Sequence, residues 1–261
     1  MRGIKDKVTI ITGSAQGIGK GIATCFAKEG AVLIVADINE EAAKATAKEL
    51  EGFGCKAEAY KINLCENDEI EAMMAYVAQK YGRIDILVNN AGIQIREWAT
   101  DFPIEKLDFL MNLNLRAYYL CSRVAARYMK EQEGGGSIVC TSSANSSCFT
   151  SKRSPYNISK AAVNGLAATF GVEWGRFGIR INAVAPGYVM TDMVRQGIAE
   201  GNIKPDKIMQ VIPMKRFLDV EEIGNAVMFL ASDDASGITG QTLFVDGGWS
   251  KCGLPEGPDG P

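Results

Sequence analysis

Short runs of branched apolar residues alternate along the chain with longer stretches in which apolar residues recur every three or four positions. The first pattern predicts buried strands and the second predicts amphipathic helices. Strands are expected at 8–12, 32–36, 56–63, 84–88, 137–141, 179–185 and 242–246. Helices are expected from the glycine-rich turn through 27, and at 40–50, 68–81, 105–131, 154–177 and 221–231. This alternation predicts an α/β fold, a doubly wound parallel sheet of about seven strands with helices on both faces.

The stretch 188–215 departs from this regular alternation. It is rich in Met and Ile but only loosely periodic, which predicts one or two short helices in a long excursion from the sheet. Excursions of this length are usually functional, so we expect substrate contacts there. The segment from Gly247 predicts no regular structure and continues as a C-terminal tail from residue 250. No linker or break in composition divides the chain, so 1–261 is expected to form one domain.

Composition and charge exclude several classes of partner. Hydrophobic residues make up 47% of the chain and charged residues 23%, as in a typical soluble globular protein. With 28 Lys and Arg against 31 Asp and Glu, the net charge is −3. This balance provides no basic field that would attract nucleic acid or an anionic membrane. No apolar run reaches the roughly 18 residues of a membrane span, and the N-terminal segment lacks a signal-peptide core.

The counts of cysteine and histidine narrow the chemistry further. Seven cysteines are scattered without a Cys-x-x-Cys pair, which fits reduced thiols in a cytoplasmic protein better than a disulfide framework or a zinc site. The chain has no histidine. This excludes Ser-His-Asp and Cys-His nucleophile systems and removes the commonest metal ligand. No metal site is expected, and proton chemistry must come from Tyr, Lys, Asp, Glu or Cys.

Tyr156 and Lys160 are the strongest candidates for that proton chemistry. Residues four positions apart on a helix lie on one face, one turn from each other. Ser154 is a suitable cap for this helix, and Pro155 suits its first position. A fixed ammonium favours the anion of a neighbouring phenol, and such a phenol can exchange a proton with an alcohol or carbonyl near neutral pH. Taken alone, the same spacing also occurs by chance on ordinary solvated helices.

A glycine-rich turn follows the first expected strand, with glycines at positions 13, 17 and 19. A strand, such a turn and a helix together form a place where a helix N-terminus can receive a pyrophosphate. The glycines let backbone amides approach the phosphates and let the helix pack closely on the strand. Because the spacing differs from G-x-G-x-x-G, a plain connection between strand and helix is the alternative.

Asp37 ends the second expected strand, about 20 residues beyond the glycine turn. A carboxylate at this place would hold the adenosine ribose hydroxyls and repel a 2′-phosphate, which favours NAD over NADP. Gln16 points the same way, since it is neutral where an arginine or lysine would meet that phosphate. The alternative is that Asp37 merely ends a strand.

Several separated motifs occur in order along nearly the whole chain: Thr12-Gly13-x-x-x-Gly17-x-Gly19, Asn89-Asn90-Ala91-Gly92, Asn112-Leu113-Asn114-Leu115, Ser143 ahead of Tyr156, and Tyr156-x-x-x-Lys160. Pro186-Gly187 with Thr191, and Val245-Asp246-Gly247-Gly248, also fit. Each motif is weak alone. Together and in register they resemble the short-chain dehydrogenase/reductase family, which implies a Rossmann-type fold and hydride transfer with a nicotinamide cofactor.

The resemblance implies catalytic roles for four residues. Tyr156 would be the general acid/base, and Lys160 would lower the pKa of Tyr156 and hold the nicotinamide ribose hydroxyls. Ser143 would hydrogen-bond the substrate oxygen, and Asn114 would support a water linked to Lys160. Ser142 is the rival of Ser143, which we prefer on spacing. Outside the family context, Asn114 reads as a polar residue within a helix and Ser143 as the end of a strand.

The resemblance also implies a dinucleotide site, with NAD preferred over NADP. At the end of the third strand the family usually has Asp to receive the adenine amino group, whereas this chain has Asn63, whose amide oxygen can still accept that bond. The residues expected to bind the cofactor are Gly13, Ser14, Gln16, Gly17, Ile18, Gly19, Asp37, Asn63, Leu64, Asn90, Ala91, Gly92, Tyr156, Lys160, Pro186, Gly187, Val189 and Thr191.

Basic residues flank the expected catalytic group: Arg96 follows the Asn-Asn-Ala-Gly motif, and Lys152 with Arg153 precedes Tyr156. The stretch 91–96 looks most like the sugar-acid members of the family, the gluconate and deoxygluconate dehydrogenases. Arginine can grip a carboxylate at two points, so we expect a sugar acid, polyol or similar polar compound of carbohydrate metabolism. Lys152 and Arg153 read equally well as solvated surface charges. The residues expected to contact the substrate are Arg96, Ser143, Asn145, Arg153 and Tyr156.

Two other functions stay in consideration. The Met- and Ile-rich stretch 188–215 could line a pocket for a bulkier apolar ketone, such as a 3-oxoacyl thioester or a hydroxysteroid. A dinucleotide-binding protein without turnover is the alternative from another class, but such proteins tend to lose the active-site residues that this chain keeps. The resemblance also implies a homo-oligomer, a tetramer, with the helices at 105–131 and 154–177 in the subunit contacts.

Overall fold

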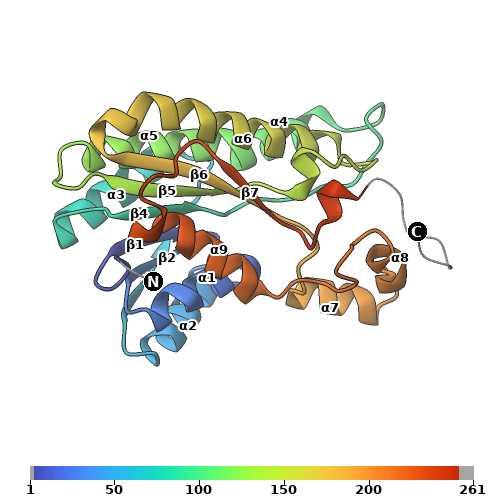
Figure 1. Cartoon of the computed structure of the whole chain (residues 1–261), viewed down its shortest axis with the longest axis horizontal. Helices are drawn as coiled ribbons and strands as arrows, with labels where there is room; N and C mark the ends of the chain where they lie inside the picture. Colours follow the sequence, from blue (N-terminus) through green and yellow to red (C-terminus); the bar gives the residue numbers. More distant parts are fainter. Residues whose placement is uncertain (1–2, 253–261) are drawn as a thin grey trace.

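All seven strands lie parallel in one sheet, in the order β3-β2-β1-β4-β5-β6-β7 (Figure 1). The computed structural model describes residues 3–252. The predicted α/β fold is confirmed, and each expected strand is found within two residues of its predicted ends. The strands are β1 (Val8–Thr12), β2 (Val32–Asp37), β3 (Lys56–Lys61), β4 (Ile86–Asn89), β5 (Gly136–Thr141), β6 (Ile179–Pro186) and β7 (Thr242–Val245).

The central strands read as continuous apolar runs because helices cover both faces of the sheet. Successive side chains of a strand point to opposite faces, so Ile10 and Ile11, adjacent on β1, belong to different hydrophobic cores. The first face is covered by α1 (Gly17–Lys28), α2 (Glu40–Glu51) and α9 (Val220–Ala231) (Figure 1). The second is covered by α3 (Asn67–Tyr81), α5 (Ala117–Met129) and α6 (Ser154–Trp174), with α4 (Ile104–Met111) beside α6.

The excursion at 188–215 contains two short helices, as its loose periodicity predicts. These are α7 (Asp192–Ala199) and α8 (Pro205–Met209), which lie beyond the carboxyl ends of the strands (Figure 1). Ile212 is buried in a third apolar cluster together with Ala144 and Trp249. This cluster joins the excursion to the segment after β5 and to the C-terminal segment, so three parts of the chain are held together at this edge of the sheet.

The C-terminal half differs from the prediction in two places. The expected helix at 154–177 ends its α-helical part at Trp174 and closes with a 3₁₀ turn, Gly175–Phe177. The segment from Gly247 is not irregular throughout, because Trp249–Lys251 forms another 3₁₀ turn. The carboxylate of Asp246 stabilises that turn by accepting hydrogen bonds from the backbone N–H groups that follow it. Residues 253–261 of the predicted tail lie outside the described residues.

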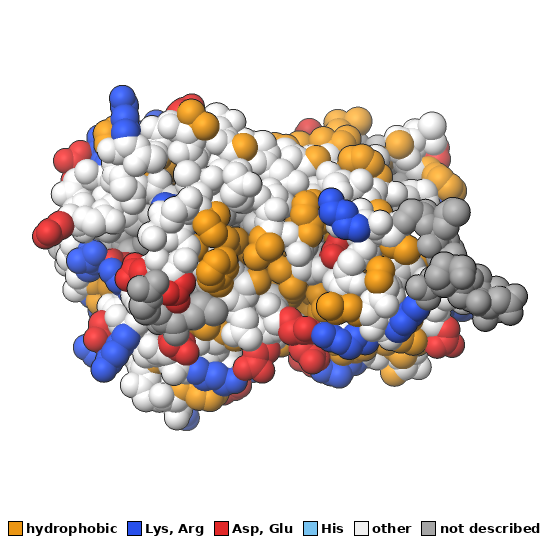
Figure 2. All heavy atoms as spheres, viewed as in Figure 1, with side chains coloured by type: hydrophobic (Ala, Val, Ile, Leu, Met, Phe, Trp, Pro, Cys, Tyr) orange, Lys and Arg blue, Asp and Glu red, His pale blue; other side chains and the backbone are white. Residues whose placement is uncertain are grey.

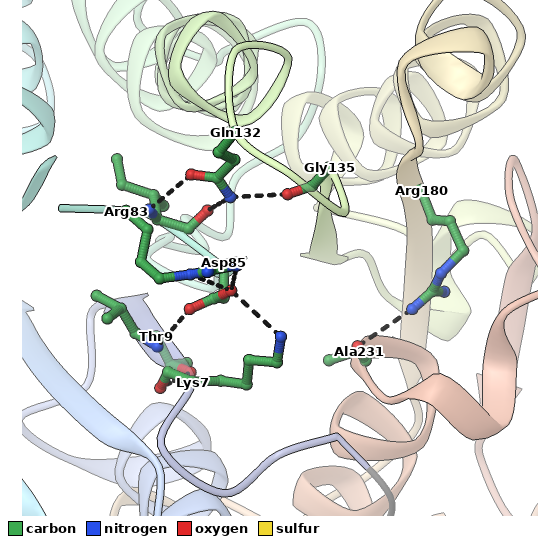
Figure 3. Close-up of polar contacts among 10 residues, drawn as sticks. Lys7, Thr9, Arg83, Asp85, Gln132, Gly135, Arg180 and Ala231 are labelled. Carbon is green, nitrogen blue, oxygen red and sulfur yellow. Dashed lines mark hydrogen bonds and ion pairs between the residues drawn. The ribbon is translucent and has the colours of Figure 1, made fainter. Parts of the chain in front are cut away.

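The amino ends of the strands are held by charged side chains that pair with one another or with the backbone (Figure 3). Asp85 is buried and accepts hydrogen bonds from the backbone N–H of Val8 (2.9 Å), from Arg83 Nε (2.8 Å) and from Lys7 Nζ (3.4 Å). Arg180 donates to backbone carbonyls around the end of α9. A pocket of about 120 Å³ lies among these residues, but Lys7, Arg83, Asp85 and Arg180 already have partners, so we assign this edge to stability.

No helix within residues 3–252 is long and apolar enough to cross a membrane. The same part of the chain contains no cluster of three or more His, Cys, Asp or Glu side chains arranged to hold a metal ion.

Candidate active site

The carboxyl ends of β1 and β4 meet where the strand order reverses, which is the usual ligand position in a doubly wound sheet. The glycine turn follows β1, and the segment 90–92 follows β4. Thr12 joins the two, because its Oγ1 accepts hydrogen bonds from the backbone N–H groups of Asn90 (2.9 Å) and Ala91 (3.2 Å). Asn90 Nδ2 in turn donates to the carbonyl oxygens of Thr12 and Gly13, both at 3.0 Å. Two motifs that are far apart in sequence thus form one structure.

Gly13 and Gly19 are required by the packing of the turn itself. Gly13 has a φ of +64°, and a Cβ at this position would lie 2.7 Å from the Cα of Ala91. A Cβ on Gly19 would overlap the carbonyl oxygen of Gly13. A larger residue at either position would therefore push β1, α1 and the segment after β4 apart.

Gly17, by contrast, faces open space at the N-terminus of α1. Its φ is +59°, and the nearest atom to a Cβ built there is Cγ2 of Thr191, 4.0 Å away. Gln16 is the N-cap residue of α1, but its side chain makes no capping hydrogen bond. The first N–H groups of the helix therefore have no side-chain cap in front of them. These features fit a bound pyrophosphate, which an open helix N-terminus accommodates.

Asp37, at the end of β2, lies beside the glycine turn as expected. Its Oδ2 accepts a 3.0 Å hydrogen bond from the backbone N–H of Ala15, and its Oδ1 accepts one of 3.0 Å from Asn39. A carboxylate can accept about four hydrogen bonds, so the same oxygens can still receive hydroxyl groups. The position fits the predicted contact with the adenosine ribose.

Asn114 lies in a π-helical turn, Asn112–Arg116, that interrupts the helix expected at 105–131. The predicted long helix is therefore present over 104–129, with one wider turn within it. Asn114 is fully buried, its Oδ1 accepts from the backbone N–H of Ile93 (2.9 Å), and its Nδ2 donates to the carbonyl of Ile93 (2.8 Å). The wider turn brings this amide against the loop after β4, and single π turns are frequent at functional sites.

Lys160 is only 3% exposed, and its ammonium lies inside the protein at the end of β5. Nζ donates hydrogen bonds to the carbonyl oxygen of Thr141 (2.7 Å) and to the hydroxyl of Tyr118 (3.4 Å). Burial lowers the pKa of Lys160 to about 8. A Cβ on Gly92 would lie 3.1 Å from Asn114 Oδ1 and 3.5 Å from Lys160 Nζ. The lack of a side chain at Gly92 therefore keeps the approach to both polar groups open.

Tyr156 and Ser143 lie next to each other beside Lys160. Burial raises the pKa of the Tyr156 phenol, while a hydrogen bond with Ser143 and the charge of Arg153 lower it. Lys160 Nζ is 5.8 Å from the centre of the Tyr156 ring and is turned towards β5. In this arrangement Ser143 and Arg153, rather than Lys160, are the groups that favour the phenolate of Tyr156.

The two candidate serines point in different directions. Ser142 is buried, and its hydroxyl donates a 2.9 Å hydrogen bond to the backbone carbonyl of Lys160. Ser143 Oγ accepts a 3.1 Å hydrogen bond from the backbone N–H of Asn145 and reaches Tyr156. Ser142 therefore stabilises α6, and Ser143 is the serine that lies at the tyrosine.

Asn145, a predicted substrate contact, is buried and holds its own loop together. Its Nδ2 donates to Thr150 Oγ1 (2.7 Å) and to Asn157 Oδ1 (3.0 Å). Asn157 Nδ2 donates to the carbonyl of Thr150 (2.9 Å). Both donor hydrogens of Asn145 are thus used within the protein, so its visible role is to shape the loop between β5 and α6.

The three basic residues near the site differ in their contacts. Lys152 Nζ lies 4.7 Å from the centre of the Trp98 ring, and the carbonyl of Lys152 accepts a hydrogen bond from the backbone N–H of Glu97. Arg96 is exposed, whereas Arg153 is half-buried and close enough to Tyr156 for its charge to affect the pKa of that phenol. Within residues 3–252 neither arginine forms a hydrogen bond or ion pair through its side chain.

The remaining predicted cofactor residues surround the site in different ways. The hydroxyl of Ser14 donates to the carbonyl of Ile11 (2.7 Å), Leu64 and Val189 are buried, and Ile18 is partly buried against the core. Asn63 Oδ1 accepts a 3.1 Å hydrogen bond from the backbone of Cys65 and keeps a second acceptor position. Three others lie at the end of β6 or just after it: Pro186 is the last residue of the strand, Gly187 packs on Asp246, and Thr191 caps α7.

Tyr118 is the residue at this site that sequence reasoning missed. It lies on α5, four positions after Asn114, and its hydroxyl accepts a hydrogen bond from Lys160 Nζ. The four-residue spacing from Asn114 was the available signal, because residues so spaced share one face of a helix. The π turn between them and the long reach of the tyrosine side chain hid that relationship.

Comparison with known proteins agrees with this geometry. The family model described as "Enoyl-(Acyl carrier protein) reductase" matches residues 13–250. The 3-oxoacyl-(acyl-carrier-protein) reductase FabG of Thermotoga maritima is 38% identical over 249 residues, covering 94% of this chain and 98% of the relative. An NAD-dependent glycerol dehydrogenase of Listeria innocua is 35% identical over 247 residues, covering 95% of each. A 3alpha-hydroxysteroid dehydrogenase of Mediterraneibacter gnavus is 39% identical over 246 residues, covering 94% and 97%.

Solved structures show the same similarity in three dimensions. A proposed gluconate dehydrogenase from Agrobacterium tumefaciens superimposes with a TM-score of 0.90 at 28% identity, covering 95% of this chain and 97% of the other. The match to the family model spans most of the sequence, including the glycine turn and the segments that carry Asn114, Ser143, Tyr156 and Lys160. The chain therefore belongs to the short-chain dehydrogenase/reductase family of oxidoreductases, which use a nicotinamide dinucleotide cofactor.

Proposed function

We propose that the protein is an NAD-dependent enzyme that interconverts a secondary alcohol and a ketone, with Tyr156 as the general acid/base. The observation that carries this proposal is the meeting of Ser143, Tyr156 and Lys160 at the carboxyl edge of the sheet, next to the open glycine turn. A protein that only bound a dinucleotide would have no need for a phenol, a hydroxyl and a buried ammonium at one point. The non-catalytic alternative is therefore disfavoured.

The nicotinamide cofactor, when bound, supplies the hydride acceptor or donor. The Tyr156 hydroxyl takes the proton of the substrate alcohol or returns it to the carbonyl oxygen. Ser143, already at Tyr156, hydrogen-bonds the same substrate oxygen and fixes its distance from the phenol. Lys160 would hold the nicotinamide ribose hydroxyls when the cofactor is bound, and Asn114 fixes the adjoining loop through Ile93.

The choice of NAD over NADP rests on Asp37. Its carboxylate is held by Ala15 and Asn39 at the position expected for the adenosine ribose. A 2′-phosphate at that position would bring two like charges together, which is unfavourable. The NAD-dependent glycerol dehydrogenase among the relatives supports the same choice.

For the substrate we propose a sugar acid, a polyol or a similar polar compound of carbohydrate metabolism. Arg153 supports this class, because a half-buried guanidinium beside Tyr156, with no ion pair within residues 3–252, suits a carboxylate of the substrate. Arg96 lies on the neighbouring loop and is exposed. The similarity to a glycerol dehydrogenase and to a proposed gluconate dehydrogenase supports a polar substrate.

A bulkier apolar ketone is the second candidate. Tyr188 and Trp249 pack with ring centres 4.7 Å apart beside the excursion at 188–215, and Met193 and Met214 of that excursion are well exposed. These side chains could contact an acyl chain or a steroid. Relatives that act as a 3-oxoacyl reductase and as a hydroxysteroid dehydrogenase favour this reading.

We further propose a cytoplasmic homotetramer. The edge strand β7 carries no charged residue and exposes 38% of Leu243, whereas the opposite edge strand β3 is protected by charged side chains. Figure 2 shows hydrophobic side chains gathered on the face that carries α9 and β7. A second surface, a groove of about 620 Å³ that includes Phe109 and Tyr119, lies on α4 and α5. A tetramer needs two separate contact surfaces, and the seven cysteines, scattered without a Cys-x-x-Cys pair, fit a reducing compartment.

A substrate screen tests the proposed function. Sugar acids, polyols, steroids and acyl ketones are each incubated with NAD(H) and with NADP(H), and nicotinamide absorbance is followed. The proposal predicts turnover of a carboxylated or polyhydroxylated substrate with NAD(H). Turnover of an acyl thioester or steroid with NADPH far above NADH would instead establish the second candidate.

Light scattering of the parent and of Leu243→Asp tests the tetramer, because a charge on β7 should reduce the assembly to dimers.

A further inference from the structure

Lys160 lies between two tyrosines that come from different helices. Tyr156 precedes it on α6, and Tyr118 approaches from α5. Tyr118 is 1% exposed, its hydroxyl is 3.4 Å from Lys160 Nζ, and Nζ lies 5.0 Å from the centre of its ring. The corresponding distance from Nζ to the Tyr156 ring is 5.8 Å. Tyr118 is therefore the closer aromatic ring to the ammonium, although no substrate-facing role was expected for it.

The Tyr118 hydroxyl, the Lys160 ammonium and the Thr141 carbonyl form a closed triangle of hydrogen bonds. The hydroxyl donates to the carbonyl oxygen of Thr141 at 3.4 Å, and Nζ donates to the same oxygen at 2.7 Å and to the hydroxyl at 3.4 Å. A tyrosine hydroxyl has one hydrogen to donate and can accept at the same time. The triangle therefore uses two of the three ammonium hydrogens. The third is available on the side of the ammonium where Gly92 and Asn114 lie.

Among residues 3–252 the ammonium has no anionic partner. The titratable groups that face it or its tyrosines are Tyr118 and Cys121 on α5, Cys140 on β5, and Tyr156 on α6. Burial raises the pKa of Cys140 to about 11, that of Cys121 to about 12, and those of both tyrosines, so all four are neutral near pH 7. Arg153 adds positive charge near Tyr156. A buried charge without a counter-ion depends on neutral hydrogen-bond acceptors.

Only two such acceptors contact the ammonium within residues 3–252, the carbonyl of Thr141 and the hydroxyl of Tyr118. We propose that Tyr118 is a positioning residue whose hydroxyl keeps Lys160 charged and aims its free hydrogen at the proposed reaction site. This inference rests on the proposed function only in the catalytic role it assumes for Lys160, because the contact between Tyr118 and Lys160 involves no substrate. The neutral Tyr118 hydroxyl acts as a fixed dipole and takes no proton itself.

The test compares Tyr118→Phe, which removes only the hydroxyl, with Tyr119→Phe, which alters the next, half-exposed tyrosine of the same helix. Each protein is labelled with lysine carrying ¹³C at Cε, and the Lys160 resonance, assigned with Lys160→Met, is followed against pH by NMR. Loss of one hydrogen bond to a charged group should move the midpoint for Lys160 about one pH unit lower in Tyr118→Phe. Tyr119→Phe should titrate as the parent does. Equal midpoints in Tyr118→Phe and the parent would overturn the proposal.

A second variant covers the case in which Tyr118→Phe does not fold. Replacing Tyr118 by 3-fluorotyrosine keeps the ring and hydroxyl but makes the oxygen a weaker acceptor, so the Lys160 midpoint should move in the same direction by less. An unmoved midpoint would overturn the proposal here too. These titrations need neither cofactor nor substrate, so they stand even if the substrate screen finds no turnover and the proposed function fails.

Turnover provides the readout that a merely structural role would not move. Where a substrate is found, the loss of activity on raising the pH through the Lys160 titration should begin at lower pH in Tyr118→Phe, in kcat rather than in KM for the substrate. A variant that only loosened the fold would lower kcat by a similar factor at every pH. A similar loss of kcat at every pH would therefore also contradict the proposed positioning role of Tyr118.

Discussion

The carboxylate of Asp37 accepts a 3.0 Å hydrogen bond from the backbone N–H of Ala15, so the end of β2 is tied to the glycine turn that follows β1. This bond places a negative charge beside the expected ribose position. It joins two elements that the sequence separates by a whole helix, and the proposed preference for NAD rests on this one side chain.

We therefore expect Asp37→Ser to change the cofactor preference. A serine can still accept from Ala15, but it no longer repels a 2′-phosphate, so kcat/KM with NADP should rise at least about tenfold while kcat/KM with NAD falls. Glu41→Gln is the matched control, because it removes the same charge from an exposed position on α2. If both variants keep the parent's ratio of NAD to NADP activity, Asp37 does not decide the cofactor.

The buried ammonium of Lys160 predicts a particular dependence of stability on pH. Its pKa is about 8 in the fold against the ordinary value of 10.5, so between these pH values the unfolded chain binds the proton and the folded one does not. The contribution of Lys160 to the free energy of unfolding therefore rises by about 3 kcal/mol as the pH increases from 8 to 10.5. The same contribution is lost as the pH falls through 8.

Lys160→Met lacks this titration while keeping every other one. In the absence of cofactor, the variant should be most stable relative to the parent below pH 8. Its free energy of unfolding minus that of the parent should then decline by about 3 kcal/mol towards pH 10.5. Urea unfolding of both proteins at a series of pH values measures the difference. A difference that stays constant over that range would show that the ammonium is not buried in the way described.

Asn114 is expected to matter for stability as well as for activity. Asn114→Ala leaves the backbone N–H and carbonyl of Ile93 without their partners in a partly buried place, which should cost about 2–4 kcal/mol. Asn112→Ala, in the same π turn, removes only an exposed hydrogen bond with Arg116 and should change stability by less than about 0.5 kcal/mol. Urea midpoints for the two variants decide the matter, and similar values would contradict the assigned role.

Arg153 is predicted to bind the carboxylate of the substrate. Arg153→Ala should raise KM for a carboxylated sugar by about 10–100-fold, as expected for a charge-assisted hydrogen bond, with a small effect on uncharged polyols. Arg96→Ala should have a smaller effect because Arg96 is exposed. Arg176→Ala, a remote cation that stacks on Phe177, serves as control. An unchanged KM in both Arg153→Ala and Arg96→Ala would eliminate the carboxylate-binding hypothesis.

Most of the fold could be predicted because parallel strands are buried on both faces and therefore read as plain apolar runs. Pro155 marked the start of α6, because it lies in the first turn of the helix, but the expected cap was wrong: the N-cap residue is Arg153 rather than Ser154, and it makes no side-chain capping hydrogen bond. The π turn at 112–116 could not be predicted, because the sequence Asn-Leu-Asn-Leu-Arg continues a helical pattern without Gly or Pro. Its cause is tertiary, the contact between the Asn114 amide and the backbone of Ile93.

The residues of the candidate site were easier to predict than the directions in which their side chains point. The motifs placed Ser143, Tyr156 and Lys160 at one edge, but sequence spacing does not say where a long side chain points. Lys160 turns to the carbonyl of Thr141, a residue of another element, and only the structure reveals this contact. The same is true of Lys152, which lies against Trp98 and so differs from Arg153, its neighbour in the chain.

Replacing Tyr156 by phenylalanine removes the hydroxyl proposed to move the proton and leaves the ring in place. With the substrate identified by the screen, Tyr156→Phe should lower kcat by about 10²–10⁴-fold, the usual contribution of a general acid/base, while its affinity for the dinucleotide is unchanged. Binding is measured by calorimetry and turnover by nicotinamide absorbance on the same sample. Turnover as fast as that of the parent would contradict the assignment of Tyr156 as the proton carrier.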